Sequence, residues 1–73
     1  MNGLPPMKEV KSSNLEAVGH QGTRLFVRFK GGGIYSYAGV PPEVYHELAA
    51  AESPGSVFRA KVRGQYKHTL HDQ

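Results

Sequence analysis

The sequence has 73 residues, with nine lysine and arginine residues against six acidic ones and a formal net charge of +3. Cysteine is absent, and no apolar run approaches the roughly 18 residues of a membrane-spanning helix. We therefore expect neither a membrane protein nor a fold held by disulfides or thiolate-bound zinc, but one thin-cored cytoplasmic domain that binds through its surface.

Residues 1–11 hold a glycine and two prolines but no periodic pattern, so they are expected to form a flexible N-terminal arm. Residues 12–67 are predicted to form the domain, and its clearest element is a strand over residues 23–30. There Leu25, Val27 and Phe29 alternate with residues that face the other way. A shorter alternation at 15–17 predicts a strand before it, and the β-forming run 34–38 predicts a strand after it.

The loops between these strands decide which side chains share a face, because a shift of one residue turns every side chain over. We favour three-residue loops at 20–22 and 31–33, each ending in glycine. They place on one face Leu15, Ala17, Leu25, Val27, Phe29, Tyr35 and Tyr37. A two-residue turn at 31–32 would instead place the two tyrosines on the opposite, basic face.

A helix is expected to begin at the proline pair 41–42, because proline suits the first turn of a helix. Its apolar stripe is formed by Val44, Tyr45, Leu48 and Ala51, and the Ser-Pro-Gly sequence at 53–55 ends the helix. Ser56 is expected to cap a short second helix that ends near residue 64, and residues 68–73 are predicted to be a flexible tail. The predicted fold is therefore α+β: a three-stranded antiparallel meander packed against one α-helix plus a short second helix, with flexible termini.

The sequence offers no residue set for catalysis or for metal binding. Its single aspartate, Asp72, is next to last, so it is poorly placed for a Ser-His-Asp arrangement. The four histidines have neither cysteines nor a carboxylate cluster to complete a coordination sphere. The glycine run at 31–33 lacks the Lys-Ser/Thr ending of a phosphate-binding loop, so we interpret it as a hairpin turn. We expect a protein without enzymatic activity, cofactor or metal ion.

Positive charge is concentrated in two places, and both suit phosphates or an acidic protein surface. Residues 59–67 hold four cations and no acid, and the strand at 23–30 carries three more. Phe26 and Ile34 form an apolar pair on the open sheet face, which indicates either a contact site or a surface covered by one of the tails. For Tyr35 and Tyr37, packing in the core and stacking on bases both stay open. The candidate partner-binding residues are Arg24, Phe26, Arg28, Lys30, Ile34, Arg59, Lys61, Arg63 and Lys67.

Six short motifs follow one another over about residues 10–67. They are Ser12-Ser13-Asn14-Leu15, Leu25-x-Val27-x-Phe29, Tyr35-x-Tyr37, Val40-Pro41-Pro42-Glu43-Val44-Tyr45, Gly55-Ser56-x-Phe58 and Arg63-Gly64-x-Tyr66. This series resembles the KTSC domain, named for its occurrence at the C-terminus of some lysyl-tRNA synthetases and also found as a free-standing small protein. The resemblance implies RNA binding. Through phage members of the family it also implies a regulator that binds the N-terminal part of the host RNA polymerase β′ subunit, displaces the σ factor and suppresses termination.

These observations lead to one hypothesis and one alternative. The hypothesis is a non-enzymatic bacteriophage transcription regulator, monomeric and active in the bacterial cytoplasm, that binds RNA polymerase through its β′ subunit. In it the apolar pair Phe26 and Ile34 anchors the partner. The strand cations Arg24, Arg28 and Lys30 guide the encounter, and the C-terminal cations add contacts. The alternative is an RNA-binding module for tRNA or nascent transcript, in which the C-terminal cations contact phosphates. Neither involves a membrane.

Overall fold

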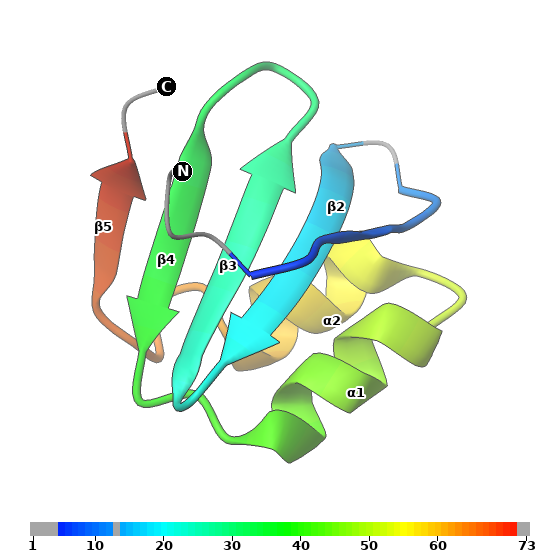
Figure 1. Ribbon diagram of the computed structural model, residues 1–73. Helices are drawn as coiled ribbons and strands as arrows, with labels where there is room; N and C mark the ends of the chain where they lie inside the picture. The colour runs from blue at the N-terminus through cyan, green and yellow to red at the C-terminus, as the bar shows by residue number, and fades with distance from the viewer. Residues whose placement is uncertain (1–4, 13, 72–73) are drawn as a thin grey trace.

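The computed structural model describes residues 5–12 and 14–71, and in it the chain forms one antiparallel sheet with two helices packed on one face (Figure 1). The elements are β1 (Lys8–Glu9), β2 (Leu15–Gln21), β3 (Arg24–Phe29), β4 (Ile34–Ala38), α1 (Pro42–Ala50), α2 (Pro54–Lys61) and β5 (His68–His71). Strands that are consecutive in the sequence are also neighbours in the sheet, whose order is β1-β2-β3-β4-β5.

The α+β class is confirmed, but the predicted three-stranded meander is wrong, because the sheet formed by the described residues has five strands. The additional strands come from segments that were expected to be flexible: β1 pairs with β2, and β5 pairs with β4. Both are short and mostly exposed edge strands, so they carry no clear hydrophobic alternation. Residues 1–4 of the predicted arm, residues 72–73 of the predicted tail and Ser13 lie outside the described residues. No helix in the described part of the chain is long and apolar enough to cross a membrane.

The turn between β2 and β3 has two residues, where the sequence predicted a three-residue loop. Gln21 pairs with Arg24, which leaves Gly22 and Thr23 as the turn. Gly22 has a φ of +65°, the left-handed value that a type II′ hairpin turn requires at its first central position. The glycine that was predicted to end the loop therefore begins the turn.

This shorter turn changes which residues of β2 face the helices. Val18 joins the core, whereas Ala17, which was predicted to join it, lies on the opposite face. The register of β2 against β3 shifts at Glu16. Leu15 pairs with Phe29 and Ala17 pairs with Arg28, so β2 has one more residue than β3 between these pairs, and this extra residue forms a β-bulge. The bulge turns Leu15 back to the helix-covered face, where it is buried as predicted.

In the β3–β4 hairpin the side chains lie on the faces of the sheet that were predicted. Val27 pairs with Tyr35, and Tyr37 lies on the same helix-covered side, so the alternative two-residue turn is excluded. The loop covers residues 30–32, one residue earlier than predicted, and the Phe29 amide donates to the Gly33 carbonyl at 3.2 Å. Since the loop keeps three residues, every side chain keeps its predicted face.

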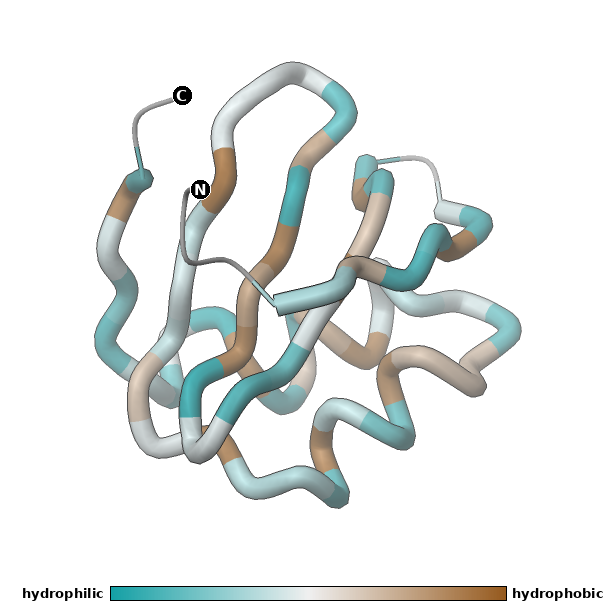
Figure 2. Tube along the Cα trace, in the orientation of Figure 1, coloured by the Kyte–Doolittle hydropathy of each residue, from teal (hydrophilic) through white to brown (hydrophobic). Residues whose placement is uncertain are grey.

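Helices α1 and α2 lie on one face of the sheet and enclose the core (Figure 1). The predicted stripe of α1 packs onto this core through Leu48, with Val44 and Tyr45 half-buried beside it. Helix α2 begins at Pro54 rather than after Ser56, because proline lacks an N–H and fits the first helical position. Figure 2 shows hydrophobic stretches in the central strands and in both helices. The core consists of Leu15, Val18, Leu25, Val27, Tyr37, Val40, Leu48, Phe58 and Val62.

The face of the sheet opposite the helices is also covered. Its apolar residues Ala17, Phe26 and Ile34 are only 1%, 6% and 1% exposed. Residues 5–10, which we call the N-terminal strap, cross in front of β2 on this face (Figure 1). A Cβ added at Gly19 would lie only 2.7 Å from the Met7 sulfur, so the strap touches the sheet directly at this glycine.

His71, on the edge strand β5, also covers part of this face. Its ring lies 5.7 Å from the ring of Phe26, and its Nε2 lies 2.7 Å from the Ser36 hydroxyl. The exposure that was expected for Phe26 and Ile34 is therefore contradicted, because both are buried. The alternative interpretation, a surface covered by one of the tails, agrees with the packing of His71, from the expected tail, on Phe26. The physical reason for their burial is that removing the apolar surface of the two side chains from water stabilises the fold.

Candidate functional site

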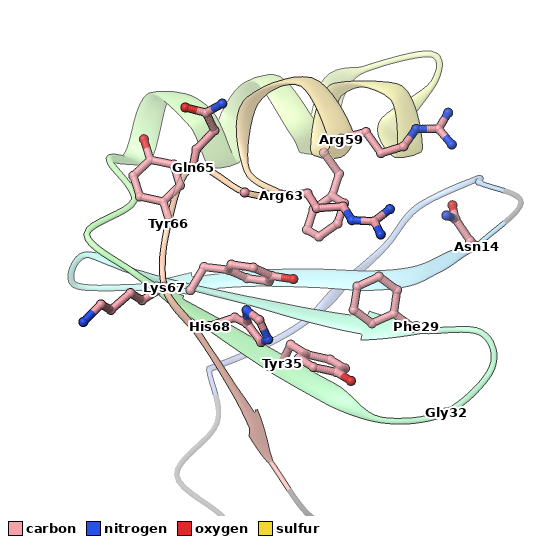
Figure 3. Close-up of a pocket in the computed structure, with 13 residues that line it drawn as sticks. Asn14, Phe29, Gly32, Tyr35, Arg59, Arg63, Gln65, Tyr66, Lys67 and His68 are labelled. Atoms are coloured by element: carbon pink, nitrogen blue, oxygen red, sulfur yellow. The ribbon is translucent and has the colours of Figure 1, made fainter.

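A groove of about 810 Å³ opens between the end of α2, the ends of β3 and β4, and the segment that leads from α2 into β5 (Figure 3). This volume lies within the range of roughly 300–1,000 Å³ that is typical of small-molecule sites. The lining divides into an aromatic floor from the sheet and α2 and a cationic rim from α2 and the segment after it.

The floor consists of rings that pack edge to face. The Phe29 ring lies 5.3 Å from Tyr35 at an interplanar angle of 85° and 5.6 Å from Phe58 at 76°. Tyr37 contacts Phe58 in the same way, at 5.4 Å and 78°. Such pairs are favourable beyond the area they bury, and they hold each ring in place. The floor is therefore formed before any ligand arrives.

His68, the first residue of β5, closes one side of this floor. Its ring centroid lies 5.6 Å from that of Tyr35 and 5.7 Å from that of Tyr37. Of the two interpretations of these tyrosines, core packing holds for Tyr37, which is 5% exposed and part of the buried core. Both tyrosines also line the groove. Within the described residues neither hydroxyl makes a hydrogen bond, so both are available to a ligand.

The rim is cationic. Arg59 lies on α2, Arg63 lies four residues later in the turn that follows, and Lys67 precedes β5. In Figure 3 the Arg63 guanidinium extends over the floor, while that of Arg59 is directed toward the end of the groove near Asn14. Among the described residues no acidic side chain lines the groove. The groove is therefore suited to an anion.

Tyr37 is the titratable group that the groove perturbs most clearly. Burial raises the pKa of its hydroxyl above the ordinary value of 10.0, and the neighbouring Tyr35 raises that pKa further. The Arg63 guanidinium opposes part of the rise. At physiological pH the hydroxyl is thus neutral and can donate a hydrogen bond into an anionic ligand.

We expect this tyrosine to reduce stability in alkaline solution. Between the unfolded pKa and the raised folded pKa, the unfolded chain releases a proton that the folded chain keeps, so a rise in pH lowers the free energy of unfolding. Urea denaturation from about pH 8 to pH 11 should show this decline, and Tyr37→Phe should flatten it. Tyr66→Phe, at the rim, is the matched control. An equally steep decline in Tyr37→Phe would contradict the assignment.

The structure separates the four C-terminal cations that were predicted to act together. Arg59, Arg63 and Lys67 line the groove. Lys61 turns to the other side of α2, where its Nζ lies 2.8 Å from Oε2 of Glu47 on α1. Helical spacing explains the difference, because residues four apart share a face and residues two apart do not.

The strand cations lie away from the groove. Arg24 and Arg28 alternate with the core residues of β3, so they face the opposite side of the sheet. Arg28 Nη1 is 3.8 Å from Glu16 Oε2, and Arg24 Nη1 donates to the Ser36 hydroxyl at 3.4 Å. Lys30 lies in the loop after β3. Arg24 and Arg28 thus share a second surface, and the apolar pair expected there, Phe26 and Ile34, is buried, with the His71 ring against Phe26.

Sequence reasoning missed four polar groove residues that are not among the predicted cations. Asn14 precedes β2, Gln65 and Tyr66 lie between α2 and β5, and His68 is the first residue of β5. The four-residue spacing of the two groove arginines was a usable signal, because it places both side chains on one side of the chain at the end of α2. Among the described residues no three histidine or acidic side chains gather closely enough to hold a metal ion.

Comparison with known proteins gives consistent relatives. The family model of the KTSC domain matches residues 11–66. A protein of Tsukamurella paurometabola is 41% identical over 63 residues, which cover 84% of this chain and 94% of that protein. An uncharacterized protein of Stutzerimonas stutzeri is 38% identical over 64 residues, covering 82% and 90% of the two chains. The crystal structure of a KTSC domain protein from Yersinia pestis matches with a TM-score of 0.87 at 25% identity, covering 92% of this chain and 97% of that one.

Proposed function

The chain belongs to the KTSC domain family, and from this premise we propose that it is a binding domain without enzymatic activity whose groove holds single-stranded RNA. The observation that supports this proposal is the composition of the groove. Arg59, Arg63 and Lys67 surround it, aromatic rings form its floor, and no acidic side chain of the described residues lines it. The RNA is a tRNA or a nascent transcript, and the site of action is the bacterial cytoplasm.

RNA supplies both kinds of group that this groove can bind. Its phosphates suit the two guanidinium groups of Arg59 and Arg63, whose planar forks match phosphate oxygens. Its bases suit aromatic surfaces, on which stacking contributes about 1–3 kcal/mol per base. Tyr66, half-buried at one end of the groove, is the ring assigned to stacking, because Tyr35 and Tyr37 already pack against His68.

The proposal predicts a salt-dependent affinity that depends on the groove cations. Binding of a fluorescent single-stranded RNA, followed by anisotropy, should weaken steeply between about 50 and 300 mM salt. Arg63→Ala should weaken binding and reduce the slope of log K against log salt by about 0.7, because one phosphate contact is lost. Lys61→Ala is the matched control, since Lys61 lies in the same stretch but pairs with Glu47.

Two results would count against this assignment. Equal losses in Arg63→Ala and Lys61→Ala would mean that general positive charge, rather than the groove, attracts RNA. An affinity that is independent of salt would mean that phosphate contacts are not responsible for binding. Circular dichroism of each variant shows whether the fold is retained.

A second proposal is that the chain is a bacteriophage transcription regulator that binds host RNA polymerase. In this proposal it contacts the N-terminal region of the β′ subunit, inhibits initiation by displacing σ and suppresses termination. Its support is the resemblance to phage members of the family, together with the cations Arg24, Arg28 and Lys30, which do not line the groove. A chain of this size would regulate polymerase by occupying a site that another factor needs.

One experiment separates the two proposals. The tagged chain is used to capture proteins from bacterial lysate, with and without nuclease treatment, at about physiological salt. Stoichiometric β and β′ subunits that survive nuclease would support the polymerase proposal, and loss of σ from them would support displacement. Ribosomal proteins and tRNA-handling enzymes that disappear with nuclease would support the RNA proposal. The double variants Arg24→Ala/Arg28→Ala and Arg59→Ala/Arg63→Ala then assign the retained partner to one surface.

A further inference from the structure

We propose that the groove contains a subsite for a terminal phosphate group of an RNA chain, an inference that rests on the RNA-binding function proposed above. The subsite lies where the Arg63 guanidinium extends over the aromatic floor, on the side of Phe29 (Figure 3). Its donors are this guanidinium and the hydroxyls of Tyr35 and Tyr37, and Lys67 adds a further positive charge at the rim.

The depth of the floor favours the end of a chain over its middle. Tyr37 and Phe58 line the groove but are only 5% and 4% exposed. The Phe58 and His68 rings pack against the Tyr37 ring at 5.4 Å and 5.7 Å, so its hydroxyl is the part left to face a ligand. A phosphate within a chain is bonded to a sugar on both sides, and both sugars would have to enter with it. A terminal phosphate has one such bond and can reach a recessed donor.

The charges of the subsite fit the same group. A phosphate monoester carries a charge of about −1.5 to −2 at neutral pH, whereas a diester carries one negative charge. Arg59, Arg63 and Lys67 place three positive charges around the groove, with no acidic side chain among the described residues that line it. The Tyr37 hydroxyl, whose pKa burial raises above 10.0, is neutral at physiological pH, so it adds a hydrogen bond without adding negative charge. The site therefore favours the more highly charged terminal group.

A terminal phosphate can stand at either end of an RNA chain, and the assay must separate the two. The full chain is titrated against single-stranded octanucleotides of one sequence that carry a 5′-phosphate, a 3′-phosphate, or hydroxyl groups at both ends. The fluorophore is placed on an internal base of each octanucleotide. We expect about tenfold or greater preference for one phosphorylated end over the doubly hydroxylated RNA, as for a charge-assisted, bidentate contact. That end identifies the source of the phosphate.

Three variants connect the preference to the subsite. Tyr37→Phe keeps the packed ring and removes only the hydroxyl, and Arg63→Lys keeps the charge and removes the planar fork. Both should reduce the preference for a phosphorylated end while they still bind hydroxyl-ended RNA. Tyr45→Phe, on α1 and outside the groove lining, is the control and should retain the preference. Thermal unfolding of each variant verifies that the fold persists.

The outcomes distinguish this inference from the proposed function. Equal affinity for all three octanucleotides would overturn the terminal-phosphate subsite and leave RNA binding in place. Absence of binding to any octanucleotide would overturn both. Displacement of the phosphorylated RNA by an acidic peptide, but not by inorganic phosphate at the same concentration, would overturn the subsite and indicate a protein carboxylate as the ligand.

Discussion

Phe26→Ala is expected to unfold a large part of the protein population rather than to weaken the binding of a partner. Phe26 is 6% exposed, lies opposite Gly19 in the sheet and contacts the His71 ring at 5.7 Å. Replacing a buried phenylalanine with alanine costs about 3–5 kcal/mol. Chains of this size often hold only about 3–5 kcal/mol in total, so the loss is comparable to the whole stability.

Urea denaturation followed by circular dichroism measures this effect. Phe26→Leu should retain most of the stability, because a large apolar side chain still fills the space. Arg28→Ala, on the same strand, should cost less than about 1 kcal/mol, because its ion pair is long at 3.8 Å and exposed. If Phe26→Ala unfolded at the wild-type urea concentration but lost affinity for polymerase, Phe26 would be an exposed anchor after all.

Gly19→Val is expected to detach the N-terminal strap from the sheet. A Cβ at this position would lie 2.7 Å from the Met7 sulfur and 2.8 Å from the Pro6 carbonyl oxygen. The methionine side chain can move aside, but the Pro6 carbonyl belongs to the backbone, so the strap itself must shift. Among the described residues, the strap pairs with β2 through the two residues of β1 and a hydrogen bond from the Val10 amide to the Glu16 carbonyl, which gives it little to resist the shift.

Limited trypsin digestion detects the detached strap, because cleavage after the exposed residues Lys8 and Lys11 requires the backbone around them to leave the sheet. We expect faster cleavage at these lysines and increased binding of an apolar dye to the uncovered face of β2 and β3. Gly31→Val is the matched control, since a Cβ at Gly31 meets no atom within 4 Å. Equal cleavage rates in Gly19→Val and the wild type would show that the strap does not depend on this glycine.

The two hairpins differed in how well the sequence predicted them. In the β3–β4 hairpin the alternation of apolar residues was sufficient to predict the faces of Tyr35 and Tyr37, because the predicted loop length of three residues was correct. The β2–β3 turn was not predictable in the same way. Gly22 fits the last position of a three-residue loop and the first position of a type II′ turn equally well. The bulge at Glu16 cannot be recognised from the alternation of apolar residues. The face predicted for Ala17 was therefore wrong, whereas the face predicted for Leu15 was right.

The candidate site was predictable only where charge alone identified it. The cationic run supplied Arg59, Arg63 and Lys67, but it also included Lys61, whose direction depends on the bounds of α2. The floor could not be foreseen, because it requires β5 to pair with β4 and bring His68 onto the tyrosines. Edge strands as short and exposed as β1 and β5 are stabilised by pairing rather than by their own hydrophobic pattern.

The strand order also determines the sequence of events during folding. The β2–β3 and β3–β4 hairpins close short loops and can form early, whereas pairing Ile34 with His71 must close a loop that contains both helices. Strand β5 is therefore expected to dock late and to open first in local unfolding. The groove is complete only when Lys67 and His68 lie beside the tyrosines, so it is expected to form when β5 docks. A ligand that contacts both β5 and the rest of the groove would slow the release of β5 and lengthen the lifetime of the native state.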